Sequence, residues 1–106
     1  MPKHNRPSYV NNVVGTSKRK CKCRVGHKTW LSHWERGTGL VRPTKCCAKY
    51  CRHPVQVGAH VRLFGEDQRV IWIIPFCQYH NKRRHNHSIE LKHGVWLCGA
   101  AKVDCV

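Results

Sequence analysis

A chain of 106 residues is long enough for one domain but leaves room for only a thin hydrophobic core. Lys and Arg number 20 against 5 Asp and Glu, and the resulting formal net charge of +15 favours a polyanionic partner. No apolar run approaches the about 18 residues of a membrane-spanning helix, and the first residues lack the apolar stretch of a signal peptide. We therefore expect a cytoplasmic protein, associated with nucleic acid or the nucleoid, without membrane contact.

Residues 1–20 form a polar and basic N-terminal arm that precedes a single domain over residues 21–106. The arm has no apolar periodicity that predicts an element, so it is either a solvated tail or a segment that lies along phosphates. Four apolar side chains could hold part of the arm against the domain: Tyr9, Val10, Val13 and Val14.

Cys21 and Cys23 are separated by one residue, and two such sulfurs can share a metal in a turn if two further ligands join them. The candidate partners are His27, His33, Cys98 and Cys105, and spacing does not choose among them. These residues would form a second metal site. The alternative is that the pair is buried or unpaired and binds no metal.

Residues 29–37 have the spacing of a short helix, with Gly37 placed to end it. Trp30, Leu31 and Trp34 fall on one face at positions i, i+1 and i+4. Buried tryptophans contribute a large area to a small core, so we interpret both rings as core residues and not as platforms for bases.

A cysteine knuckle and two strands follow this helix. Residues 55–64 alternate apolar and polar side chains, which is typical of a strand with one buried side. After a turn at residues 65–67, residues 69–74 are apolar on both faces and predict a second strand. Pro75 is expected to end that strand.

The rest of the chain predicts one more helix and two more strands. The helix runs from Cys77 to about Arg84, and the strand candidates are residues 88–91 and 95–97. Knuckle, hairpin and helix in this order indicate a treble clef over about residues 45–87. The predicted class is therefore a small α+β domain, with an extra N-terminal helix and C-terminal strands around that treble clef.

Thiols and an imidazole flank the predicted hairpin on both sides. Cys46 and Cys51 precede it, Cys77 and His80 follow it, and Cys47 is an alternative to Cys46 because either spacing fits a knuckle. Four such ligands form the tetrahedral structural site that zinc prefers. In a reducing compartment, clustered cysteines indicate metal before disulfides.

Two other interpretations of these residues stay open. One is a set of buried structural cysteines with a surface histidine that binds nothing. The other is a secreted cationic peptide whose eight cysteines form disulfides.

Three segments carry a family resemblance: the Cys-x₄-Cys knuckle, the strand Gly58-Ala59-His60-Val61, and Ile74-Pro75-Phe76-Cys77 followed by His80-Asn81. Over roughly residues 45–87 the chain resembles the ββα-metal module of HNH endonucleases. The resemblance implies structural zinc on the cysteines and His60 as general base. It places Asn81 at the last position that binds a catalytic divalent cation.

The chain departs from the HNH pattern at two positions. Ala59 stands where the family usually has an acidic or histidine metal ligand, and Trp72 stands where it has an asparagine that orients the base. A hard cation such as Mg²⁺ then has few oxygen ligands, so the catalytic set is incomplete. The wider pattern is similar to small uncharacterised bacterial and phage proteins, which implies no activity.

Basic residues precede, accompany and follow the predicted zinc site, where they could neutralise phosphates. The candidates are Lys18, Arg19, Lys20, Lys22, Arg24, Lys45, Lys49, Arg52, Lys82, Arg83 and Arg84. We predict a zinc-stabilised nucleic-acid-binding protein that contacts mainly the backbone, of DNA before RNA. The alternatives are an HNH-like metal-dependent endonuclease, and a cationic inhibitor that occupies the nucleic-acid channel of a partner with an acidic groove.

Overall fold

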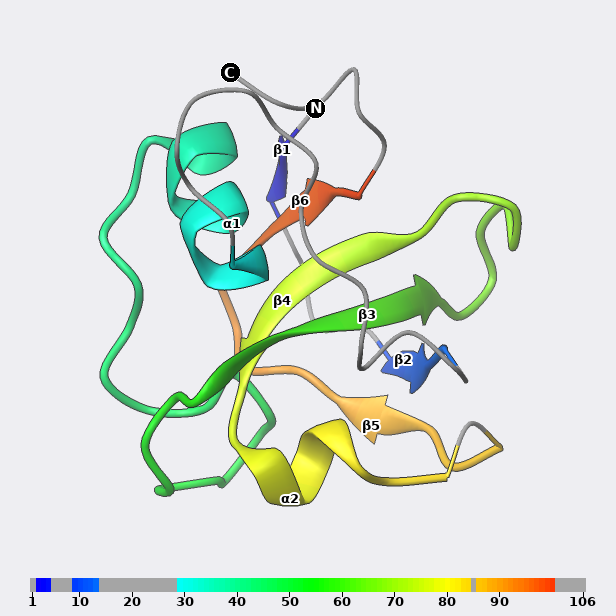
Figure 1. The fold of residues 1–106 in the computed structure, drawn as a ribbon. Coiled ribbons are helices and arrows are strands. Elements are labelled where there is room, and N and C mark those ends of the chain that lie inside the picture. The colour runs from blue at the N-terminus through cyan, green and yellow to red at the C-terminus, as the bar shows by residue number, and fades with distance from the viewer. Residues whose placement is uncertain (1, 5–8, 14–28, 85, 101–106) are drawn as a thin grey trace.

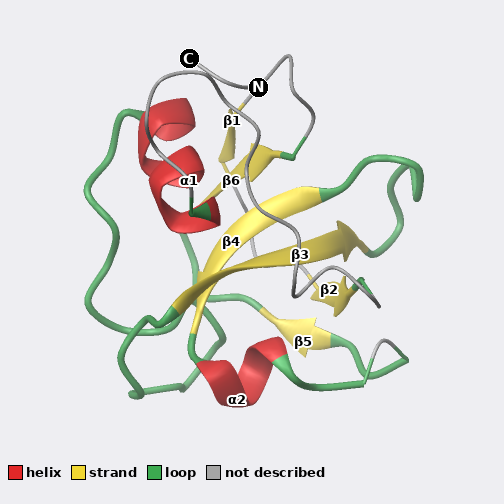
Figure 2. Ribbon diagram, viewed as in Figure 1, coloured by secondary structure: helices red, strands yellow, loops and turns green. Residues whose placement is uncertain are grey.

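The computed structural model describes residues 2–4, 9–13, 29–84 and 86–100. In these residues six strands form one antiparallel sheet in the order β1-β6-β4-β3-β2-β5, with two helices packed on it (Figure 1, Figure 2). The strands are β1 Pro2–His4, β2 Tyr9–Asn12, β3 Val57–Leu63, β4 Trp72–Phe76, β5 Ile89–Glu90 and β6 Trp96–Gly99. The helices are α1 Trp30–Thr38 and α2 Gln78–Asn81. The predicted α+β class is confirmed.

The sheet separates two apolar clusters. Ala59 and Val61 of β3 point into the larger cluster, which also contains Phe76 and the buried cysteines of the knuckle. On the other face α1 contributes Trp34, which packs with Ile73 and Cys98. Successive side chains of a strand point to opposite faces, so the two clusters use alternate residues of the same strands.

Helix α1 begins and ends at identifiable caps. The Thr29 side chain accepts a hydrogen bond from the Ser32 backbone N–H at 3.1 Å, as an N-cap does. The helix continues through Gly37, so the expectation that Gly37 ends it was wrong. Gly39 ends it instead, with φ of 72° and a backbone N–H that donates to the Glu35 carbonyl at 2.9 Å.

The face of β3 opposite the larger cluster is partly covered, although the sequence predicted only one buried side. Helix α1 lies across Gly58 and His60, and His60 is 7% exposed. A side chain at position 58 would place its Cβ 2.7 Å from the Trp30 carbonyl carbon. Glycine therefore permits the close approach of helix and strand.

Pro75 lies inside β4 and does not end it, which corrects the prediction for residues 69–74. Its carbonyl accepts a hydrogen bond from the Cys47 N–H at 3.1 Å, on the side of β4 away from β3. The proline nitrogen points to the same side, so the missing N–H costs no β3–β4 hydrogen bond. The strand begins at Trp72, three residues later than predicted.

The N-terminal arm contributes two strands to the sheet, which neither interpretation of residues 1–20 anticipated. β1 pairs with β6, and β2 lies between β3 and β5. Val10 is fully buried, so it does hold the arm against the domain as expected. Tyr9 is half exposed, and Val14 lies outside the described residues.

Helix α2 is one turn long and ends at Asn81, whereas the sequence predicted a helix to about Arg84. The Asn12 side chain donates to the carbonyls of His80 and Arg83 at 2.7 and 3.0 Å, which joins β2 to the end of α2. Strands β5 and β6 lie where two short strands were predicted, with bounds that differ by one or two residues. Among the described residues, none of the helices has the length and apolar character to cross a membrane.

Candidate metal centre

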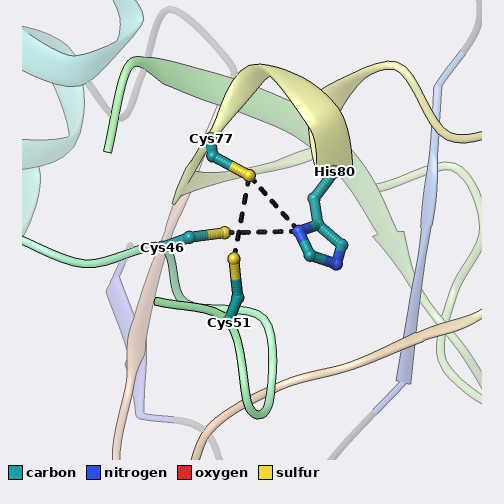
Figure 3. Close-up of side chains that lie close together, drawn as sticks. All are labelled: Cys46, Cys51, Cys77 and His80. Carbon is teal, nitrogen blue, oxygen red and sulfur yellow. Dashed lines mark hydrogen bonds between the residues drawn. The ribbon is translucent and has the colours of Figure 1, made fainter. Parts of the chain in front are cut away.

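Cys46, Cys51, Cys77 and His80 converge on one point from two distant parts of the chain (Figure 3). Cys46 and Cys51 lie in the loop before β3, which we call the knuckle (residues 45–54). A bridge between Lys45 and Pro54 closes its base. Cys77 is the N-cap of α2, and His80 lies within that single turn. The i, i+3 spacing places both side chains on the same side of the helix.

The distances between the ligand atoms fit a tetrahedral metal site. All four atoms lie within 4.8 Å of one another. The Sγ atoms of Cys51 and Cys77 are 3.9 Å apart, and His80 Nδ1 lies 3.7 Å from Cys46 Sγ and 3.3 Å from Cys77 Sγ. Bond lengths of about 2.3 Å to sulfur and 2.0 Å to nitrogen imply edges of about 3.8 and 3.5 Å around tetrahedral zinc.

The thiols of this group are buried and reduced. Cys46, Cys51 and Cys77 are each less than 10% exposed, and they are free cysteines. Burial raises the pKa of Cys46 to about 12, because a thiolate is poorly solvated there. A cation at the centre would supply the charge that stabilises the thiolate forms, since metal binding displaces the thiol protons.

His80 presents a ring that can act as a neutral ligand. Its pKa is lowered chiefly by burial, and further by the positive charges of Arg83 and His53. A lowered pKa favours the neutral imidazole, which is the form that coordinates a metal.

Cys47 is not part of the group. Its side chain is 2% exposed and lies in the larger apolar cluster. Its backbone N–H donates to the Pro75 carbonyl, and its own carbonyl accepts from the Lys92 N–H at 2.9 Å. Cys47 therefore fixes the knuckle to the sheet, and of the two alternatives Cys46 faces the metal position.

The predicted second metal site is not assembled by the described residues. Among these, the Cys3His group is the only cluster of three or more potential ligands. Cys98 is buried, and the His33 ring nitrogen Nε2 lies 2.7 Å from the Gly99 carbonyl oxygen. The other candidates lie outside the described residues: Cys21, Cys23, His27 and Cys105. A second site therefore stays a prediction.

The structure does not bring His60 and Asn81 together. The His60 ring lies under α1, with its centroid 4.5 Å from that of Trp30. Asn81 is the last residue of α2, and the His80 carbonyl of that helix accepts a hydrogen bond from the Asn12 side chain. Asn12 pairs with Val61, so its side chain lies on the face of the sheet opposite His60. The strands therefore separate the two residues that the HNH resemblance places in one catalytic site.

The basic candidates among the described residues lie in the knuckle and directly after α2, close in sequence to the ligands of the metal group. Lys45, Arg52, Lys82 and Arg84 are exposed, and within the described ranges they form no ion pair. The Lys49 ammonium forms an ion pair with the Glu90 carboxylate at 2.9 Å. The remaining candidates lie outside the described residues: Lys18, Arg19, Lys20, Lys22 and Arg24.

An open hollow of about 440 Å³ lies between the knuckle and α2, and we call it the knuckle hollow. It is lined by Cys51 and His80 of the metal group and by Lys49, Tyr50, Arg52, His53 and Tyr79. No acidic residue is among these lining residues. Tyr50 and His53 were not predicted as site residues, although each follows a cationic residue of the knuckle, Lys49 and Arg52.

Fold and site together define a small α+β domain whose Cys3His group could hold a structural metal. Comparison with protein-family models, with curated proteins and with solved structures finds no match to this chain.

Proposed function

We propose that the protein is a zinc-stabilised nucleic-acid-binding protein that holds DNA mainly through its phosphates. Three thiols and one imidazole are the donor set that zinc takes in structural sites. With four protein ligands the site has no open position for a substrate, so the metal supplies folding energy and rigidity. Cys46 and Cys51 would hold it from the knuckle, and Cys77 and His80 from α2.

We further propose that the metal-bound core is a treble clef. Its support is the order of elements: the knuckle, the β3–β4 hairpin, and α2 with Cys77 at its N-cap. The resemblance to HNH modules then concerns the scaffold. The separation of His60 and Asn81 by the sheet argues against an assembled HNH catalytic site.

One observation carries the nucleic-acid proposal. The metal group joins the knuckle to α2, so Arg52 lines one hollow with Tyr79 and His80, which lie shortly before Lys82 and Arg84 in the chain. None of these three cations has an ion-pair partner among the described residues. Cations grouped on one surface bind a phosphate backbone and release its condensed counterions. The net charge of +15 adds a long-range attraction to any polyanion.

Salt dependence tests this proposal. We expect the affinity for a fluorescent DNA duplex to fall linearly with log salt between about 50 and 300 mM, with a slope near −0.9 for each phosphate contacted. Arg52→Ala should reduce the magnitude of that slope by about one contact. Arg69→Ala removes the same charge at the hairpin, where Arg69 is paired with Asp67 at 3.1 Å, and should leave the slope unchanged. Binding that ignores salt would contradict the proposal.

The two alternatives are separated by simple assays. An HNH-like nuclease would nick plasmid DNA with Mg²⁺, Mn²⁺ or Ni²⁺, and we expect no cleavage with any of them. An inhibitor that fills the acidic groove of a protein would bind free DNA weakly at every salt concentration. Tight, salt-sensitive binding of free duplex therefore favours the proposed function over both.

A further inference from the structure

Two exposed tyrosines border the knuckle hollow from its two sides. Tyr50 comes from the knuckle and is 88% exposed, and Tyr79 comes from α2 and is 59% exposed. Large aromatic side chains usually bury most of their area in a small domain. Two exposed rings on one hollow are therefore an unusual feature that neither the metal group nor the apolar core requires.

Each ring is held beside a cation. The Lys49 ammonium lies 5.2 Å from the Tyr50 ring centroid, and Lys49 is itself held by Glu90. The Arg83 guanidinium lies 5.5 Å from the Tyr79 ring centroid and donates to the Tyr79 hydroxyl at 2.8 Å. These contacts restrict both rings, so little conformational freedom is lost when a planar ligand stacks on them.

The backbone at Tyr50 is strained in a way that presents its ring. Tyr50 has φ of 65°, the only positive φ among the described non-glycine residues. Such a conformation is unfavourable for a residue with a side chain, and strain of this kind clusters at binding sites. The residues on either side are fixed, because the Lys49 N–H donates to the Glu90 carbonyl and the Cys51 N–H to the Ala48 carbonyl.

We propose that the knuckle hollow binds an unpaired nucleotide, with its base stacked on Tyr50 or Tyr79 and its phosphate on Arg52. The inference deepens the proposed function and rests on it. Its support is the pairing of flat apolar surfaces with cations in one open hollow, which matches the alternation of base and phosphate along a single strand. The bases of a duplex are stacked on one another and do not offer their faces. The ligand class is therefore single-stranded nucleic acid.

The metal group and the hollow share a wall. His80 contributes to both, and its ring lies edge-on to that of Tyr79 with centroids 5.1 Å apart. Fixing the His80 ring on the metal therefore also limits the positions of Tyr79. The metal would thus organise the stacking surface without touching the nucleic acid.

The test uses the full chain and two probes, an oligothymidine strand that carries one 2-aminopurine and a blunt duplex. We expect wild-type protein to quench the 2-aminopurine by stacking. Tyr50→Ala combined with Tyr79→Ala should weaken single-strand binding by about 5- to 150-fold and abolish the quenching. The same variant should bind the duplex within about twofold of wild type, because its cations are unchanged.

Two controls separate the ring from the fold. Tyr50→Phe keeps the ring and the positive φ, so it should bind the single strand within about twofold of wild type, unlike Tyr50→Ala at the same backbone position. Phe64→Ala removes another ring, 71% exposed near the hairpin tip, and should change neither probe. Circular dichroism and zinc content confirm that each variant is folded.

The outcomes are distinct. Unchanged single-strand binding and quenching in the double tyrosine variant, with salt-dependent duplex binding retained, would overturn this inference and leave the proposed function standing. Wild-type protein that binds neither probe would overturn both. If Tyr50→Phe bound the single strand as weakly as Tyr50→Ala, that result would also contradict stacking, because the aromatic ring would then not account for the affinity.

Discussion

Asn12 connects two parts of the fold through one side-chain amide. It lies on β2, is 6% exposed, and donates to the carbonyls of His80 and Arg83 at the end of α2. The last carbonyls of a helix have no partner in a following turn, and this amide donates to the His80 carbonyl, which also accepts from the Arg83 N–H at 3.3 Å. Asn12 also places the arm directly behind the turn that carries His80.

Replacing Asn12 tests this connection. Asn12→Ala should lower the free energy of unfolding by about 1–2 kcal/mol, because two hydrogen bonds are lost. Asn12→Asp should cost more than Asn12→Ala, because a buried carboxylate would face two carbonyl oxygens. Denaturant unfolding of zinc-loaded protein at neutral pH measures both. An aspartate variant as stable as the alanine variant would contradict the assigned contacts.

Ligand chemistry predicted Cys51, Cys77 and His80 of the metal group, because thiols and imidazole in two close pairs have few other uses. The choice between Cys46 and Cys47 could not be predicted, since both spacings fit a knuckle. The direction of the backbone determines which thiol faces the metal position, because backbone hydrogen bonds of Cys47 to Pro75 and Lys92 fix it against the sheet. Asn12 carried no signal either, because its partners lie about seventy positions away.

At the scale of elements, α1 is positioned by the strand beneath it. Gly58 of β3 lets the backbone of Trp30 and Leu31 approach closely, and Leu31 and Trp34 are both less than 10% exposed. Trp34 also donates from its indole to the Trp96 carbonyl at 2.8 Å. The helix is therefore bound to β3 by close backbone packing and to β6 by a hydrogen bond.

Gly58→Ala tests the packing of α1. The added Cβ would lie 2.7 Å from the Trp30 carbonyl carbon and 2.8 Å from the Leu31 nitrogen, so the helix must shift. We expect a loss of about 1–3 kcal/mol, seen as a lower thermal midpoint. Gly65→Asn is the control, because position 65 has no neighbour within 4 Å and asparagine tolerates its φ of +80°. A Gly58→Ala variant as stable as wild type would contradict the observed packing.

The type of an element could be predicted where its hydrophobic periodicity is strong. Predictions failed where contacts with distant parts of the chain determine the structure. The alternation of β3 predicted its inner face, but Gly58 and His60 read as solvent-facing until α1 covers them. Strands β1 and β2 are short and polar, so only pairing with distant strands defines them. Pro75 was predicted to end the strand because it has no backbone N–H. The sequence does not indicate whether that missing donor would face a neighbouring strand.

For the molecule as a whole, the Cys3His group connects two segments that the sequence separates by 25 residues, from Cys51 to Cys77. A domain with so thin a core would gain much of its stability from a metal at this connection, since structural zinc contributes on the order of 10 kcal/mol where it is bound. The same closure places Lys49 and Arg52 of the knuckle in one hollow with Tyr79 and His80, which lie shortly before Lys82 and Arg84 in the chain. Fold stability and the proposed nucleic-acid surface thus depend on one group.

Zinc counting by native mass spectrometry tests this dependence most directly. Cys51→Ala should carry one zinc fewer than wild type, because it removes one of the four ligands. Cys47→Ala, which removes a neighbouring buried thiol outside the group, should carry as many as wild type. Equal zinc in Cys51→Ala and wild type, or a folded wild-type chain that holds no zinc, would contradict the account.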